Sequence, residues 1–326
     1  MIILVFIIAL TFSLTYLLTF ALVKTLPKKG FVVEDYHKQG KPKIAWPGGP
    51  AILLSIVLVE SILYSIYGDP RILSLILVTI IAGSIGFIDD LMKFNRGIIK
   101  PSLLILASLP ILLLGTYDFH LTFPIFGSVR ISMIYPILVL FAIPVVSNAT
   151  NMIDVLNGAL SGFMAITTLP LIFALILRSD YTILLAALPL IASSLAFYIF
   201  HRHPSKIFPG DSGSLTYGAM FCAIAIVGRV EIVAVIAILP AILNSFFILS
   251  SIKGLVEHRN IKTRPTVLLS DSRLAASEDP QAPATLVRMI LIDGPLSERE
   301  VVLNIFKLSA FSAFLGMIMA LATWCI

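Results

Sequence analysis

The amino-acid sequence predicts an all-α polytopic membrane protein with about ten transmembrane helices and a small mixed α/β loop between helices 9 and 10. Three observations lead to this fold class. Of the 326 residues, 58% are hydrophobic and 13% are charged, and the mean hydropathy is +1.02. Nearly uncharged runs long enough to cross a bilayer recur along the chain. The basic residues are confined to the segments between these runs.

The apolar runs give the expected helices, whose edges are uncertain by a few residues. The first run lacks the basic leader and small-residue cleavage site of a signal peptide, so we expect it to be the first span. Cys222 and Cys325 both lie in apolar runs and make neither a disulfide framework nor a metal pair. The expected spans are residues 1–23, 49–67, 72–88, 101–117, 131–146, 159–177, 181–200, 213–228, 232–252 and 308–326.

The distribution of Lys and Arg predicts the orientation in the cell membrane. Of the 23 basic residues, 19 fall in the segments after spans 1, 3, 5, 7 and 9. Cytoplasmic loops carry an excess of Lys and Arg, so both termini are expected outside and the odd-numbered spans are expected to run inward. The net charge of +5 therefore reflects topology and does not indicate nucleic-acid binding.

Two connections between spans are expected to have structure of their own. The longest outward connection, 118–130, is expected to form a hairpin. The long cytosolic segment 253–300 is soluble-like in composition: its 266–269 run predicts a strand, and its 284–292 run predicts a strand or an amphipathic helix. We expect residues 1–326 to form a single transmembrane domain that contains this loop.

A row of polar residues follows the fifth apolar run. Asn148, Asn151, Asp154 and Asn157 occur at three-residue spacing in the segment S-N-A-T-N-M-I-D-V-L-N-G. Side chains three apart are neighbours on a helix, but the first and last of these four would lie on opposite sides of a straight helix. The helix is therefore expected to break near 155–158, or the row serves two ligands. Polar groups at a membrane boundary are costly unless they have a function; the competing interpretation is a helix end with ordinary polar caps.

Adjacent carboxylates, Asp89 and Asp90, lie at the inner end of the third span. Two such groups at a membrane boundary are costly without a cation or a role in proton transfer. The competing interpretation is a solvated helix end that Lys93 and Arg96 balance.

Asp211 lies between glycines in the segment I-F-P-G-D-S-G, directly before the eighth span. Glycine permits close approach of the backbone to a ligand. The start of a helix favours an anion and Asp211 favours a metal ion, so a metal–phosphate unit satisfies both. The competing interpretation is that Asp211 is only the N-cap of the eighth span.

These acid and amide sites converge with basic clusters on one face of the membrane. One cluster, Glu257-His258-Arg259, precedes Lys262 and Arg264 and suits either phosphate or the membrane surface. Mg²⁺ binds through one or two carboxylates and completes its shell with substrate phosphates and water. Lys and Arg neutralise phosphate oxygens. The sequence therefore predicts a cytosolic-face site for a phosphorylated, diphosphate-bearing substrate.

The order D-D-x-x-K, N-x-x-N-x-x-D-x-x-N-G, F-P-G-D-S and H-R resembles the polyprenyl-phosphate N-acetylhexosamine-1-phosphate transferases (glycosyltransferase family 4). These include the bacterial phospho-MurNAc-pentapeptide translocase and the eukaryotic dolichyl-phosphate GlcNAc-1-phosphotransferase. The resemblance runs from about Asp35 to Arg259. It implies that a UDP-activated amino sugar and a polyprenyl or dolichyl phosphate meet with Mg²⁺, or Mn²⁺ in its place, to give a sugar-diphospholipid and UMP. It also suggests a homodimer.

The resemblance implies roles for individual residues. Asn151 and Asp211 are expected to be the metal ligands. Asp89 and Asp90 match the paired catalytic aspartates, which deprotonate the lipid phosphate or organise the site. Lys100 resembles the lysine that holds phosphate. Asn157 and Phe208 match the positions that recognise uracil, and His258 and Arg259 match the pair that contacts the diphosphate and the sugar. The expected substrate-binding residues are Lys100, Asn148, Asp154, Asn157, Phe208, His258 and Arg259.

Two departures from the family pattern bear on the sugar. Lys93 follows the translocase pattern, whereas the H-R motif and the long 253–300 loop are more like the dolichyl GlcNAc enzymes. Because the loop is expected to reach the sugar, UDP-GlcNAc is favoured over UDP-MurNAc-type and UDP-GalNAc donors. A nucleotide-sugar or lipid transporter is the alternative from another class. A transporter places polar groups near the midplane, where Glu60 is the main candidate here. A catalytically dead scaffold is disfavoured by the presence of both Asn151 and Asp211.

Overall fold

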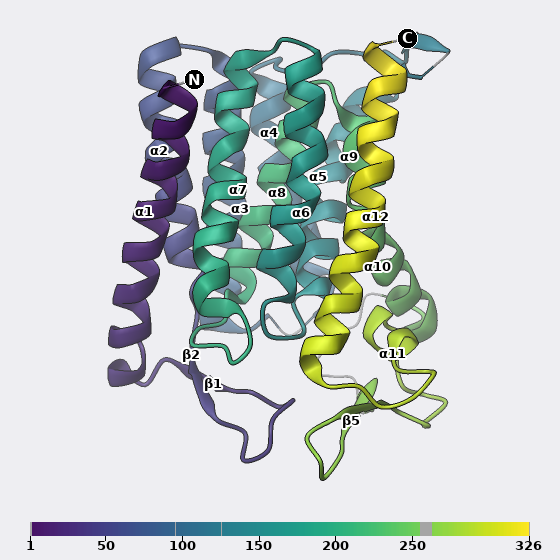
Figure 1. Cartoon of the computed structure of the whole chain (residues 1–326). Helices are drawn as coiled ribbons and strands as arrows, with labels where there is room; N and C mark the ends of the chain where they lie inside the picture. Colours follow the sequence, from purple (N-terminus) through teal and green to yellow (C-terminus); the bar gives the residue numbers. More distant parts are fainter. Residues whose placement is uncertain (1, 95, 125, 255–262, 326) are drawn as a thin grey trace.

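The computed structural model describes residues 2–94, 96–124, 126–254 and 263–325. The chain forms a mostly helical bundle whose long helices run side by side (Figure 1). The start of α1 and the end of α12 lie at the same end of the bundle (Figure 1). The helices are α1 (Ile2–Thr25), α2 (Gly49–Tyr67), α3 (Pro70–Met92), α4 (Ile99–Leu113), α5 (Tyr135–Ile153), α6 (Ala159–Leu177), α7 (Tyr181–His201), α8 (Gly210–Val227), α9 (Glu231–Ala237), α10 (Leu239–Ile252), α11 (Leu286–Ile290) and α12 (Glu298–Trp324), with a 3₁₀ turn at Pro27–Lys29.

Within the described residues, seven helices are long and apolar enough to cross a membrane, or eight if α9 and α10 are counted as one bent span. This confirms the prediction of a mostly helical, multi-pass membrane protein. The expected span 101–117 corresponds to α4, which has only 15 residues. The expected span 213–228 corresponds to α8, whose first turns are polar.

One expected span is bent, and the start of the last one was wrong. The expected span 232–252 is bent by 64° between α9 and α10. Pro240 lies in the first turn of α10, and because proline has no N–H and clashes with the preceding turn, a continuous helix is disfavoured there. The last helix begins at Glu298 instead of near residue 308, because Ser297 and Glu300 form a capping box that starts it ten residues earlier.

Helix α8 lies in the interior of the bundle, and every residue from Ser212 to Val227 is buried. Glycines permit its close contacts with α3 and α2. A Cβ atom at Gly86 would lie 2.4 Å from the carbonyl oxygen of Asp211, and one at Gly49 would lie 2.2 Å from the backbone nitrogen of Gly213. Small residues are the usual means by which membrane helices approach closely.

Three two-stranded antiparallel hairpins connect the helices. The expected hairpin at 118–130 is confirmed, and so is a mixed α/β segment before α12. In that segment the 266–269 run is a strand and the 284–292 run contains helix α11, which resolves the alternative left open by the sequence. The hairpin between α1 and α2 was not expected. The pairs are β1 (Val32–Glu34) with β2 (Lys43–Ala45), β3 (His120–Phe123) with β4 (Gly127–Arg130), and β5 (Thr266–Leu268) with β6 (Leu274–Ala276).

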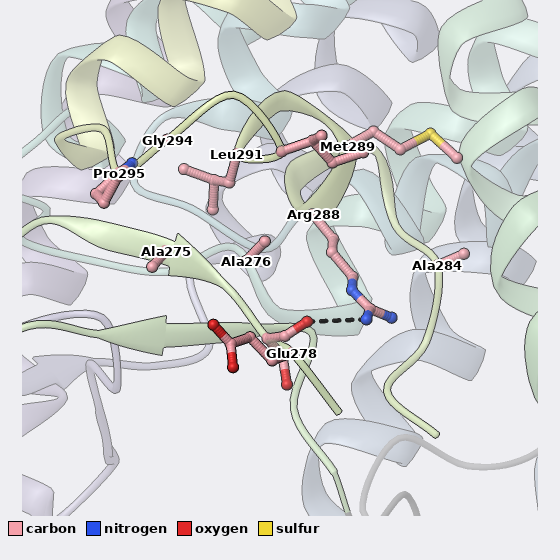
Figure 2. A pocket seen from close by; sticks show the side chains of 11 residues that line it. Ala275, Ala276, Glu278, Ala284, Arg288, Met289, Leu291, Gly294 and Pro295 are labelled. Atoms are coloured by element: carbon pink, nitrogen blue, oxygen red, sulfur yellow. Dashed lines mark hydrogen bonds between the residues drawn. The ribbon is translucent and has the colours of Figure 1, made fainter. Parts of the chain in front are cut away.

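The segment from β5 to α11, here called the lobe, contains a hollow of about 590 Å³ between β6 and α11 (Figure 2). Arg288 lies at its edge. Its guanidinium donates hydrogen bonds to the carbonyl oxygens of Ser277 at 2.8 Å and Asp279 at 3.0 Å, and to that of Ala282. Arg288 therefore stabilises the segment between β6 and α11.

Ion pairs join the helices at the end of the bundle where α3 and α7 begin. Arg71 lies 2.7 Å from Asp69 and 2.5 Å from Asp180, and Asp180 also accepts a hydrogen bond from the backbone of Ile183 as the N-cap of α7. Arg71 and Asp180 line a hollow of about 550 Å³ at this end. One arginine therefore joins the starts of two helices that are distant in sequence.

The Arg71→Met variant is expected to lower the melting temperature in detergent by a few degrees. It removes two partly exposed ion pairs, each of which contributes at most about 1 kcal/mol, and leaves the helix caps in place. The contacts of Asp89 and Asp90 are expected to be unchanged, because Arg71 lies at the opposite end of α3. A wild-type melting curve for Arg71→Met would show that these pairs do not stabilise the fold.

Candidate active site

Four helix ends meet at the end of the bundle opposite the chain termini. Asp89 lies at the end of α3, Lys100 at the start of α4, Asn151 at the end of α5 and Asp211 at the start of α8. The ammonium group of Lys100 pairs with Asp89 at 2.7 Å and also with Asp211. The side-chain amide of Asn151 donates a hydrogen bond to Asp211 at 2.7 Å. We call Asp89, Lys100, Asn151 and Asp211 the acid–lysine cluster.

Asp90 is adjacent to this cluster but has different contacts. Its Oδ1 accepts a hydrogen bond from the backbone N–H of Asp211 at 2.8 Å. Its Oδ2 accepts hydrogen bonds from the backbone N–H of Ser212 at 3.0 Å and the hydroxyl of Ser212 at 2.6 Å. The N-cap position of α8 is Pro209, which provides no side-chain cap. Asp90 therefore caps α8 from another helix, and Asp211 is not the cap.

Asp89 is completely buried, and it too is held from both sides. Its Oδ1 accepts a hydrogen bond from the backbone N–H of Phe94 at 2.7 Å, and its Oδ2 faces Lys100. A buried carboxylate is costly unless it is paired. The pairing with Lys100 therefore offsets part of the cost of burying Asp89.

Asp154 follows the end of α5 and faces the same region. Burial raises the pKa of its carboxyl well above the usual range, and the nearby charges of Asp211 and Asp90 raise it further. The nitrogen Nε2 of His201 lies 3.6 Å from Asp154. The helix break that the sequence predicted after Asp154 is confirmed, since α5 ends at Ile153.

The carboxylates in this region exceed the cations around them. Among the described residues, Asp89 and Asp211 share one cation, Lys100. Burial favours the neutral form of Asp154, and Asp90 is balanced by the start of α8. No group of three or more His, Cys, Asp or Glu side chains that could hold a metal ion occurs in the described part of the chain. Mg²⁺ nevertheless needs only one or two protein carboxylates when phosphates and water supply its other ligands. Asp211 and Asn151 fit this ion by residue type: Asp211 would supply a carboxylate oxygen, and Asn151 would supply its amide oxygen after rotation of the side-chain amide, whose nitrogen donates to Asp211 here.

Two expected substrate-binding residues have hydrogen-bond partners within the protein. Asn148 donates a hydrogen bond to the carbonyl oxygen of Pro144 in its own helix and does not join the cluster. Asn157 is 2% exposed. Its side chain binds Asp35, the ammonium group of Lys38 and the backbone N–H of Ser205. A role of Asn148 and Asn157 in substrate recognition stays a prediction.

The contacts of Asn157 define a second polar group of residues that the sequence did not indicate. Asp35 and Lys38 come from the hairpin between α1 and α2 and form an ion pair. Burial acts to raise the pKa of Asp35, but hydrogen bonds from Lys38 and Asn157 outweigh it, so the pKa lies below its usual range. Glu298, at the start of α12, accepts a hydrogen bond from the backbone of Asn157. These partners lie more than 100 positions from Asn157, so no local pattern could reveal them.

Phe208 is half-buried and lies in the turn between α7 and α8. Its backbone is bound on both sides by the segment before α2, through hydrogen bonds with Ala45 at 3.0 Å and Gly48 at 2.8 Å. Its ring meets His201 edge to face at 6.1 Å. A role of Phe208 in stacking on uracil stays a prediction. His258 and Arg259 lie outside the described residues.

The lobe contacts the hairpin between α1 and α2. The side-chain amide of Gln39 donates a hydrogen bond to the carbonyl oxygen of Leu269 at 2.9 Å. The guanidinium of Arg264, two residues before the lobe begins, lies 4.3 Å from the centre of the Tyr36 ring, a favourable cation–π distance. Two loops that are far apart in sequence thus meet beside the site.

The fold and the site together define a multi-pass membrane protein with an acid–lysine cluster suited to phosphoryl chemistry. Residues 72–229 match the model of glycosyl transferase family 4, and this segment contains the whole cluster. The chain is 30% identical to the phospho-N-acetylmuramoyl-pentapeptide-transferase of Bacillus subtilis over 69% of this chain and 71% of that protein. It is 26% identical to the Saccharolobus solfataricus protein named "Putative UDP-N-acetylglucosamine--dolichyl-phosphate N-acetylglucosaminephosphotransferase", over 97% of this chain and 96% of that protein.

The chain belongs to glycosyl transferase family 4, so it is a membrane-bound enzyme of this family. The resemblance inferred from the sequence motifs is thereby confirmed.

Proposed function

We propose that this enzyme transfers a phospho-N-acetylhexosamine, GlcNAc-1-phosphate, from a UDP-sugar to a polyprenyl or dolichyl phosphate. The observation that carries the proposal is the convergence of Lys100, Asn151 and Asp211 at one end of an apolar bundle. A water-soluble nucleotide and a lipid phosphate can meet only at such a boundary. The Saccharolobus relative, which aligns over nearly the whole of both chains, supports GlcNAc as the sugar.

In the proposed reaction, an oxygen of the lipid phosphate forms a bond to the sugar-bearing phosphorus, and the bond from that phosphorus to the bridging oxygen breaks. The electron pair leaves with UMP. Lys100 is placed to neutralise phosphate oxygens. Mg²⁺ held by Asn151 and Asp211 would supply further positive charge to the diphosphate. Asp90 keeps the start of α8, and with it Asp211, in position, and Phe208 offers a ring face to uracil.

We propose ten spans, with α4 and α8 counted among them and α9 with α10 counted as one, and a site on the cytosolic face. The 19 basic residues in the segments at the site end support this orientation. We further propose that the lobe recognises the sugar, because it meets the hairpin between α1 and α2 beside the site. The polar side chains of the site lie at one end of the bundle, which favours an interfacial enzyme over a transporter with a midplane site.

Purified protein given UDP-GlcNAc, a polyprenyl phosphate and Mg²⁺ is expected to release UMP and form a GlcNAc-diphospholipid. EDTA is expected to stop the reaction, and added Mg²⁺ or Mn²⁺ to restore it. The same assay with UDP-GalNAc and a muramoyl-pentapeptide nucleotide tests the sugar. The Bacillus relative makes the muramoyl nucleotide the second candidate donor. Lipid product formed in EDTA would contradict the metal role, and UMP release from the muramoyl nucleotide alone would contradict GlcNAc.

A further inference from the structure

Glu298 is a buried carboxylate at the first position of α12, with 4% of its surface exposed. Its Oε1 accepts a hydrogen bond from the backbone N–H of Asn157 at 2.7 Å. Its Oε2 lies 2.9 Å from Nδ1 of His203 and 3.9 Å from the ammonium group of Lys38. Burying a carboxylate is costly unless it is paired. One side chain therefore binds three segments that precede it by 95 residues or more.

The helix that carries Glu298 does not need it as a cap. Ser297 and Glu300 form the capping box of α12, with the backbone N–H of Ser297 donating to Glu300 at 2.8 Å. Glu300 is exposed, and among the interactions of the described residues it contacts none of the loops that Glu298 holds. Both are acidic residues in the first turn, and both favour the helix dipole. Of these two residues, Glu298 alone has long-range contacts within the part of the chain that the structure describes.

The two turns that Glu298 joins carry site residues. One turn, 154–158, begins with Asp154 and contains Asn157. The other, 202–209, contains His203 and ends beside Phe208. The backbone N–H of Ser205 in the second turn also donates to the Oδ1 of Asn157 at 2.7 Å. The separation between Asp154 and Phe208 therefore depends on contacts that Glu298 and Asn157 make.

Glu298 also links these turns to the lobe. It follows Leu296 by two residues, and Leu296 exchanges backbone hydrogen bonds with Leu274 of β6 at 2.8 and 3.0 Å. A short, hydrogen-bonded connection therefore joins β6 to these turns. Glu298 makes no contact with Asp89, Asn151 or Asp211 among the interactions of the described residues.

We propose that Glu298 is a positioning residue for the nucleotide sugar. It holds the turn with Asp154 and the turn with Phe208 at the separation that fits this substrate, and it couples that separation to the lobe. The inference rests on the proposed function of the same site. It assigns a role to a residue outside the segment 72–229 that matches the family model.

The test uses the full-length protein in detergent and compares steady-state constants. Glu298→Ala is expected to raise the Michaelis constant for the UDP-sugar about tenfold or more, because charged hydrogen bonds to two turns are lost. The turnover number and the Michaelis constant for the lipid phosphate are expected to change less than about twofold. Glu298→Gln keeps an oxygen for the N–H of Asn157 and is expected to show a smaller increase than Glu298→Ala.

Glu300→Ala is the matched control. It removes an acidic residue of the same helical turn and one half of the capping box, so it is expected to lower the melting temperature without changing the Michaelis constant for the UDP-sugar. Equal effects of Glu298→Ala and Glu300→Ala on that constant would overturn the proposal, because fraying of α12 would then explain both. An unchanged constant in Glu298→Ala would overturn it as well.

Two further outcomes need their own tests: a Glu298→Ala variant that does not fold, and a wild-type protein that does not release UMP. If Glu298→Ala does not fold, the variants Glu298→Gln and His203→Ala test the proposal in its place. A rise of about threefold or more in the Michaelis constant for the UDP-sugar in both variants supports the proposal. Wild-type values of this constant in both variants overturn it. Absence of UMP release by the wild-type protein from every UDP-sugar would contradict the proposed function instead. The positioning role is then tested by UMP binding in calorimetry, where wild type is expected to bind more tightly than Glu298→Ala and equal affinities would overturn the role.

Discussion

Asp211→Ala is expected to lower turnover by at least about 10³-fold while the protein still folds. Asp211 binds Lys100 and Asn151, so the substitution removes the carboxylate around which the cluster is assembled. Loss of a group that holds a divalent cation against a diphosphate costs several kcal/mol of transition-state stabilisation. UMP release under saturating substrates measures the effect, and a melting curve in detergent reports folding.

The matched control is Asp118→Asn. It removes a negative charge that pairs with Arg229 at 2.8 Å at the far end of the bundle. Turnover is expected to stay within about twofold of wild type. Near-normal turnover in Asp211→Ala would remove Asp211 from the chemistry and leave the acid–lysine cluster with a structural role only.

Asp90→Ala is expected to destabilise the protein by about 3 kcal/mol or more and to abolish turnover through the displacement of Asp211. The substitution leaves the backbone N–H groups of Asp211 and Ser212 and the Ser212 hydroxyl buried without their acceptor. Each unpaired buried donor costs about 1–3 kcal/mol. Asp90→Asn keeps one acceptor oxygen, so both its melting temperature and its turnover are expected to lie between those of wild type and Asp90→Ala.

A comparison with Asp89→Asn distinguishes the role of Asp89 from that of Asp90. Asp89 binds the backbone N–H of Phe94 and pairs with Lys100. It does not cap the backbone of α8 as Asp90 does, so its neutralisation is expected to reduce turnover with a smaller loss of stability than Asp90→Ala. If Asp90→Asn had wild-type stability and yet lost as much turnover as Asp211→Ala, Asp90 would act in proton transfer and its capping role would be secondary.

Hydropathy located the helices well because each one is a long apolar run in the sequence. It failed where stability depends on something other than apolar composition. The run that contains α9 and α10 is continuous in hydropathy, and only Pro240 indicated the bend. The first ten residues of α12 contain four charged side chains, so hydropathy excluded them, although the Ser297 to Glu300 spacing matches a capping box.

Part of the site could also be predicted from the pattern of apolar runs. Asp89, Asn151 and Asp211 stand out as polar groups at the ends of apolar runs, and the structure brings them together with Lys100. The role of Asp90 could not be read from the sequence, because the helix that it caps lies about 120 positions away. Glu298 was missed because its partners are likewise distant and two of its three contacts involve loops with irregular backbone.

The glycine contacts of α8 have a consequence for how the enzyme moves. Gly86 and Gly49 let α3 and α2 touch the backbone of α8 directly, and Asp90 fastens its first turn. A helix held in this way has no room to slide or rotate, so the floor of the site is expected to stay fixed through the catalytic cycle. Entry of the donor and departure of UMP would then require movement of the two hairpins that meet at Gln39 and Leu269, and their rate of separation would set the upper limit on turnover.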